Sequence, residues 1–277
     1  MEKIKIFRNT LKLRNIDMFY LDTRTEKTAI ICLHGMYGRA ETWQAFIQNY
    51  GTKYRIISPD QRGHGLTSKP KEPYTIKIMA EDIVELLKAL KLQAAILVGH
   101  SMGGGIAAYL AANYPEYIKA LAILDKSPTN LNATNKLSID RNTLIDPLTG
   151  NWPLPFATLT EATSFIKSAS CSDLEYTYFM NSLMETSSGY KMMFDSKAMA
   201  SIFLNSLDFW DILSRIKCLT MIVRSSSHEG IPNEDFKRME ACLKNHLAFE
   251  MSNKDHNVHL SNKEEFYTCF DKFLSSI

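Results

Sequence analysis

The sequence predicts an α/β protein: a mostly parallel central sheet with helices on both faces, plus an inserted helical cap. Short apolar segments of strand length alternate along the chain with longer segments of helical periodicity. Several of the strand segments are apolar throughout, so both of their faces require a covering layer. Between about residues 127 and 206 this alternation stops, and strand-like sequence resumes only at Leu219.

The expected strands follow in order. Residues 16–21 alternate in polarity, which is typical of a strand at the edge of a sheet. Inner strands are expected at segments that are short and apolar: residues 29–33, 55–57, 94–98, 121–124, 219–223 and 247–249.

Helices are expected at residues 41–49, 76–90, 102–114, 233–244 and 262–274. In the second of these, Ile76, Ile83 and Leu87 recur at helical spacing opposite charged residues, as on a surface helix that covers a sheet. We expect Asn233 to cap the fourth helix and Ser261 the last, with Glu264 completing a capping box.

The predicted domain organisation is a core in two parts, residues 1–126 and 207–277, separated by the cap at residues 127–206. The cap concentrates methionine and aromatic residues. Such side chains either form an adaptable apolar lining for an acyl chain or ring, or pack the cap onto the core. Both interpretations remain open for these residues: Met180, Met184, Met192, Met193, Met199, Tyr176, Tyr178, Phe179, Tyr190 and Phe194.

Composition excludes several classes of protein. The 277 residues carry 32 basic and 30 acidic side chains, so the net charge of +2 favours neither nucleic acid nor an anionic membrane as a partner. The 5 cysteines are scattered and odd in number, which indicates reduced thiols and a cytoplasmic location. Residues 92–115 lack charge, but a glycine-rich turn interrupts them, so no membrane span is expected.

Residues 99–103 read Gly-His-Ser-Met-Gly and fit the pattern G-x-S-x-G. They lie between an apolar strand and a helix rich in glycine and alanine, which is the context that this motif requires. The sharp turn presents the Ser101 hydroxyl at the positive end of a helix. Ser101 is therefore the predicted nucleophile; the alternative is a glycine-rich turn with a solvated serine.

A serine nucleophile that attacks a carbonyl group needs N–H donors for the oxygen that becomes anionic. The backbone amide of Met102, directly after Ser101, is the first predicted donor. The second is the amide of Met36, because the glycine-containing loop after the strand at 29–33 turns back toward the same edge of the sheet.

These motifs together resemble the alpha/beta-hydrolase fold. The resemblance rests on His34-Gly35, on the loop at residues 60–65, on the motif around Ser101 and on Asp255-His256. It implies the chain order nucleophile, acid, histidine. His256, in a polar loop after the last strand, is the predicted base, and His259 is the alternative. The pair forms H-x-x-H without further ligands, so no metal is expected.

The acid of the triad has two candidates. The loop after the strand at 219–223 holds no aspartate, where this family usually carries one, so Glu229 is preferred. Asp125, at the end of the strand at 121–124, is the alternative, since some branches of the fold place the acid there.

The resemblance implies a serine hydrolase that cleaves a carboxylic ester of a small, largely apolar substrate through an acyl-enzyme on Ser101. A serine nucleophile disfavours epoxide hydrolases and haloalkane dehalogenases, which use aspartate. An acyl-homoserine lactonase, a thioesterase and a carbon–carbon bond hydrolase share the same groups and stay open. So does a ligand receptor without turnover. No cofactor is required, and the oligomeric state is not predicted.

Overall fold

The computed structural model describes residues 4–71, 74–130 and 144–277. Its central sheet has eight strands in the order β1-β2-β4-β3-β5-β6-β9-β10. The strands are β1 (Phe7–Lys12), β2 (Asp17–Asp22), β3 (Ala29–Leu33), β4 (Arg55–Pro59), β5 (Ala95–His100), β6 (Ile118–Leu124), β9 (Leu219–Arg224) and β10 (His246–Glu250). Strand β2 pairs antiparallel with β1 and β4, and the remaining pairs are parallel. The predicted fold class is therefore confirmed.

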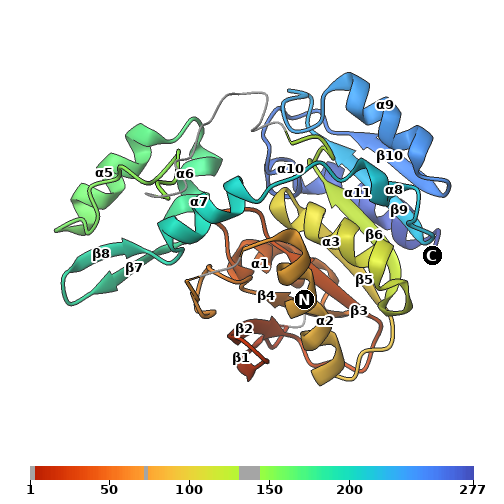
Figure 1. Cartoon of the computed structure of the whole chain (residues 1–277), viewed down its shortest axis with the longest axis horizontal. Coiled ribbons are helices and arrows are strands. Elements are labelled where there is room, and N and C mark those ends of the chain that lie inside the picture. The colour runs from red at the N-terminus through yellow and green to blue at the C-terminus, as the bar shows by residue number, and fades with distance from the viewer. Residues whose placement is uncertain (1–3, 72–73, 131–143) are drawn as a thin grey trace.

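The sheet is covered on both faces (Figure 1). Helices α2 (Ile76–Ala89), α3 (Met102–Asn113), α8 (Trp210–Leu213) and α9 (Asn233–Cys242) contribute to one hydrophobic cluster. Helices α1 (Gln44–Tyr50) and α11 (Lys263–Leu274), with the 3-10 turn η1 (Ala40–Trp43), contribute to the other. Short turns η2 (Pro115–Tyr117) and α10 (Val258–Ser261) complete the core.

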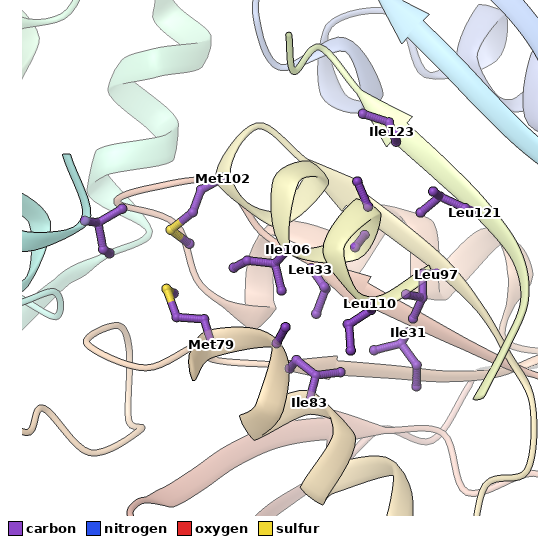
Figure 2. Packing of buried hydrophobic residues seen from close by; sticks show 14 of the residues in the cluster. Ile31, Leu33, Met79, Ile83, Leu97, Met102, Ile106, Leu110, Leu121 and Ile123 are labelled. Carbon is purple, nitrogen blue, oxygen red and sulfur yellow. The ribbon is translucent and has the colours of Figure 1, made fainter. Parts of the chain in front are cut away.

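Strand β3 shows why both faces are apolar. Ile31 and Leu33 belong to the cluster beneath α2 and α3, whereas Ile30 and Cys32 belong to the opposite cluster. In Figure 2, Ile31 and Leu33 lie under Ile106 and Leu110 of α3. Alternate side chains of one strand therefore reach opposite layers, as the continuous apolar run predicts.

Three local predictions need correction. Strand β1 was not expected from the sequence, because its side chains alternate between partly buried and exposed. The fourth helix has Pro232, not Asn233, at its N-cap, since the Asn233 Oδ1 accepts a hydrogen bond from Arg224. The last helix is capped by Asn262, which accepts from the Glu265 amide, so the predicted cap Ser261 and capping-box Glu264 are each displaced by one residue.

Between β6 and β9 the chain forms α5 (Leu159–Ala169), α6 (Asp173–Met180), the hairpin of β7 (Leu183–Thr186) and β8 (Gly189–Met192), and α7 (Ser196–Leu204). These elements extend to one side of the sheet in Figure 1, from green to teal. The predicted cap at 127–206 was expected to be helical, and the β-hairpin is an addition. Residues 131–143 of that cap lie outside the described residues, and its boundaries stay a prediction.

Candidate active site

Ser101 occupies a strained turn between β5 and α3. Its φ of 51° and ψ of −117° lie outside the regions that non-glycine residues favour. The turn is held by a hydrogen bond of 2.9 Å from the Ser101 amide to the Leu124 carbonyl of β6. Strain of this kind costs about 1–3 kcal/mol and persists only where the surrounding structure enforces it.

The glycines around Ser101 are required by close packing. A Cβ on Gly99 would lie 2.2 Å from the Gly103 carbonyl oxygen, and a Cβ on Gly103 would lie 2.4 Å from the Leu33 carbonyl oxygen. Helix α3 therefore begins directly against β5 and β3. This contact explains in physical terms why the motif has glycine on both sides of its serine.

The structure joins His256 to Asp125. The Nδ1 atom of His256 lies 2.8 Å from Asp125 Oδ2. A carboxylate only accepts hydrogen bonds, so Nδ1 carries the proton and donates it. The Nε2 lone pair is thereby left free to accept a proton. The Asp125 side chain is fully buried, whereas the His256 side chain is 48% exposed.

The preference for Glu229 as the partner of His256 is corrected by this geometry. Glu229 is exposed, and its carboxylate forms no hydrogen bond within the described part of the chain. Asp125 instead accepts hydrogen bonds from the amide and hydroxyl of Ser225, at 3.0 and 3.2 Å, besides the one from His256. Several donors therefore orient the carboxylate of Asp125, whereas none orients that of Glu229 within the described residues.

Sequence reasoning missed two groups that support this pair. A Cβ on Gly230 would lie 2.4 Å from Asp125 Oδ2, so glycine leaves room for the carboxylate. The His100 Nε2 atom lies 2.9 Å from the backbone oxygen of His256 and donates to it, which anchors the loop of that histidine. Burial lowers the pKa of His100 far below its usual value, so it stays neutral. The motif leaves position 100 unspecified and therefore gave no signal.

One cavity of about 420 Å³ brings the predicted residues together. Its lining includes Ser101, His256 and Asp125, and also Glu229. Met36 and Met102, whose amides were predicted to bind an oxyanion, line it too. The Ser101 hydroxyl makes no hydrogen bond with His256 or with any other described residue.

The two predicted donor amides have no internal acceptor among the described residues. Met102 is the first residue of α3, where an N–H group lacks a partner within the helix. Met36 lies in the loop after β3, and its amide makes no backbone hydrogen bond. A Cβ on Gly35 would lie only 3.2 Å from the Ser101 Cβ, so this loop passes close beside the serine.

The loop at Met36 is held by the cap. The Tyr37 hydroxyl donates to Asp146 at 2.8 Å, and the Ser182 hydroxyl donates to the Tyr37 carbonyl at 2.7 Å. The Tyr178 hydroxyl donates to the Gly35 carbonyl at 3.2 Å. Burial and the neighbouring Asp146 raise the pKa of Tyr37, so its hydroxyl remains a donor. The position of the Met36 amide therefore depends on how the cap is seated.

Two further histidines, His259 and His64, are buried. His259, the alternative base, is buried and stacks on Trp43 with ring centroids 4.3 Å apart. Burial lowers its pKa to about 3. In the loop at residues 60–65, burial also lowers the pKa of His64, to about 4. Neither side chain belongs to the cavity that contains Ser101.

None of the five methionines singled out in the cap sequence lines the cavity. Among the ten methionine and aromatic residues singled out in the cap sequence, only Tyr178 and Phe179 line the cavity. Met192, Met193 and Met199 are buried in the packing of the cap. The methionines that line the cavity are Met36, Met79 and Met102, from the core.

Comparison with known proteins identifies the family. Residues 28–259 match the alpha/beta hydrolase fold family. The chain belongs to this family and is a hydrolase. It is 24% identical to a Haemophilus influenzae protein with the provisional name esterase/lipase, over 89% of this hydrolase and 83% of that protein.

Solved structures show the same fold. The crystal structure of E-2-(acetamidomethylene)succinate hydrolase superposes with a TM-score of 0.80 at 21% identity, covering 98% of this hydrolase and 100% of that chain. The thioesterase domain from the curacin biosynthetic pathway has a TM-score of 0.75 at 21% identity, with 95% and 98% covered. In the described ranges of this hydrolase, no helix has the length and apolar character needed to span a membrane.

Proposed function

We propose that this hydrolase cleaves carboxylic esters of small, largely apolar substrates through an acyl-enzyme on Ser101. His256 acts as the base and Asp125 as the acid of the triad. The observation that carries the proposal is the bond of 2.8 Å from His256 to the buried Asp125, in the same cavity as a serine held at a strained turn.

The chemistry follows from the proton positions. The free Nε2 of His256 takes the Ser101 proton as Oγ attacks the ester carbonyl. The amides of Met36 and Met102 donate to the oxyanion, each contributing about 3 kcal/mol. His256 then protonates the leaving alcohol, and water releases the acyl group by the same steps. Asp125 stabilises the imidazolium ion that forms at each stage.

Lactones and thioesters present the same carbonyl group, and the thioesterase domain described above shares the fold. A panel of esters, lactones and thioesters therefore defines the substrate. Esters are preferred in the proposal because a relative that aligns over 89% of this hydrolase carries an esterase name.

The test is the variant Ser101→Ala with short p-nitrophenyl esters. We expect hydrolysis to fall by on the order of 10⁴-fold or more, because no other nucleophile is activated. A fluorophosphonate should add covalently to the wild-type chain and not to the variant, as measured by intact mass. Ser226→Ala, at a hydroxyl that donates to the Ser252 carbonyl, is the matched control.

Unchanged hydrolysis in Ser101→Ala would end this assignment. One slow turnover followed by a stable adduct would instead favour a ligand receptor.

A further inference from the structure

Lys126 is the lysine that lines the described cavity around Ser101. The residue directly follows Asp125, at the end of β6, and it lines the cavity. Its stem runs along α3: a Cβ on Gly104 would lie 3.1 Å from the Lys126 Cβ, and one on Gly105 would lie 3.8 Å from its Cε. The glycines that begin α3 therefore leave the space that the lysine stem occupies.

Among the residues that the structure describes, no direct ion pair neutralises the charge of Lys126. Within the described ranges, no carboxylate oxygen lies within 4 Å of its Nζ atom, and Nζ makes no hydrogen bond there. Burial lowers its pKa, and the carboxylate that acts against this is Asp208. The Oδ1 atom of Asp208 also accepts a hydrogen bond from the Asn130 amide, at 2.5 Å.

The cavity is therefore electrically asymmetric. Asn205 and Ser206, after α7, line it together with Lys126. Glu175 and Glu229 also line it, and Glu175 accepts a hydrogen bond from the Cys171 amide of the cap. The wall carries an ammonium-bearing residue directly after Asp125, and two carboxylate residues from α6 and from the loop after β9. A substrate with a single anionic group would gain at the first and be repelled at the second.

We infer that Lys126 binds a carboxylate of the substrate, so that the preferred ester carries one further acid group on an otherwise apolar chain. An ammonium group that has lost water on burial gains most from a charged acceptor, because charge-assisted hydrogen bonds are the strong ones. This inference rests on the proposed function for the position of the ester bond. The remaining part of the substrate's acyl group is then the apolar part.

The experiment compares monoethyl adipate with ethyl hexanoate, an ester of the same acyl length without the acid. We expect a higher kcat/KM for monoethyl adipate. In Lys126→Met the ratio of the two kcat/KM values should fall by about tenfold, the size of one charge-assisted hydrogen bond. Lys126→Arg, which keeps the charge, should retain most of the preference. Lys119→Met removes an exposed lysine of the same strand and should leave the ratio unchanged.

Binding is measured separately with protein that carries Ser101→Ala. Calorimetric titration with monoethyl adipate should show binding that weakens about tenfold when Lys126→Met is added. If no ester is hydrolysed but this dependence on Lys126 is found, the proposed function fails and the anion site stands. If esters are hydrolysed without preference for the acid, the anion site is refuted and the esterase assignment stands.

A purely structural role for Lys126 predicts something different. In that case Lys126→Met would lower the melting temperature while leaving the preference ratio and the affinity unchanged, and this result would overturn the inference. Should Lys126→Met fail to fold, Lys126→Gln allows the same comparison.

Discussion

Replacing Asp125 by asparagine tests the arrangement of the triad most directly. The amide has nearly the shape of the carboxylate, and its oxygen can still accept from the Ser225 amide, as Oδ1 does at 3.0 Å. The NH₂ group then takes the place of Oδ2, which faces His256 Nδ1 at 2.8 Å. Since an NH₂ group cannot accept, Nδ1 must lose its proton to accept from it, and the proton moves to Nε2.

That tautomer has no lone pair directed at Ser101, so the base is lost although the site is intact. The same tautomer change in a serine protease costs about 10⁴-fold in kcat, or ~5 kcal/mol. We expect a loss of this size in p-nitrophenyl ester hydrolysis by Asp125→Asn, with a melting curve close to that of the wild type. Circular dichroism checks the fold.

The matched comparison is Glu229→Gln. Glu229 is exposed and its carboxylate accepts no hydrogen bond within the described residues, so the rate should change by less than about twofold. Asp125→Glu should also lose activity, because Gly230 packs so closely against Oδ2 that even a single added Cβ would lie 2.4 Å from it. A loss in Glu229→Gln equal to or greater than that in Asp125→Asn would refute this reasoning.

Two further predictions concern stability. Gly103→Ala would place a Cβ 2.4 Å from the Leu33 carbonyl oxygen and should lower the free energy of unfolding by about 3 kcal/mol. In Gly105→Ala the added Cβ has its nearest neighbour at 3.6 Å, so the substitution should raise the free energy of unfolding by up to ~1 kcal/mol through helix propensity. Urea unfolding measures both, and equal losses would contradict the packing argument. The pKa of His259 is lowered by burial to about 3, so the folded state binds its proton less readily than the unfolded state and stability falls as the pH drops below about 6.5. His259→Phe keeps a ring against Trp43. Between pH 7.5 and 5, the free energy of unfolding of this variant should therefore fall by about 2 kcal/mol less than that of the wild type. An equal fall in the two proteins would show that His259 does not titrate in this way.

Much of the fold was predictable because its signals are local. A run such as residues 29–33, apolar on every side chain, specifies a strand covered on both faces wherever it occurs, and β3 has those bounds. Strand β1 lacks that signal, since its pattern of partial burial arises only from pairing with β2. The last helix is capped by Asn262 and not by the adjacent Ser261, and two neighbouring polar residues give the same local signal for a cap.

In the candidate site, the sequence by itself located Ser101 and His256. The backbone of a strand-turn-helix motif limits which residues fit around the serine, and chain order limits the choice of histidine. For the acid, the sequence favoured Glu229 over Asp125, and the structure instead joins His256 to Asp125. Strands β6 and β9 are neighbours in the sheet, so the loops that follow them emerge at the same edge, and both carboxylates line one cavity. Only the tertiary structure decided which carboxylate is buried and turned toward His256, because that depends on space left by Gly230 and on donors from Ser225, groups about a hundred residues from Asp125 along the chain.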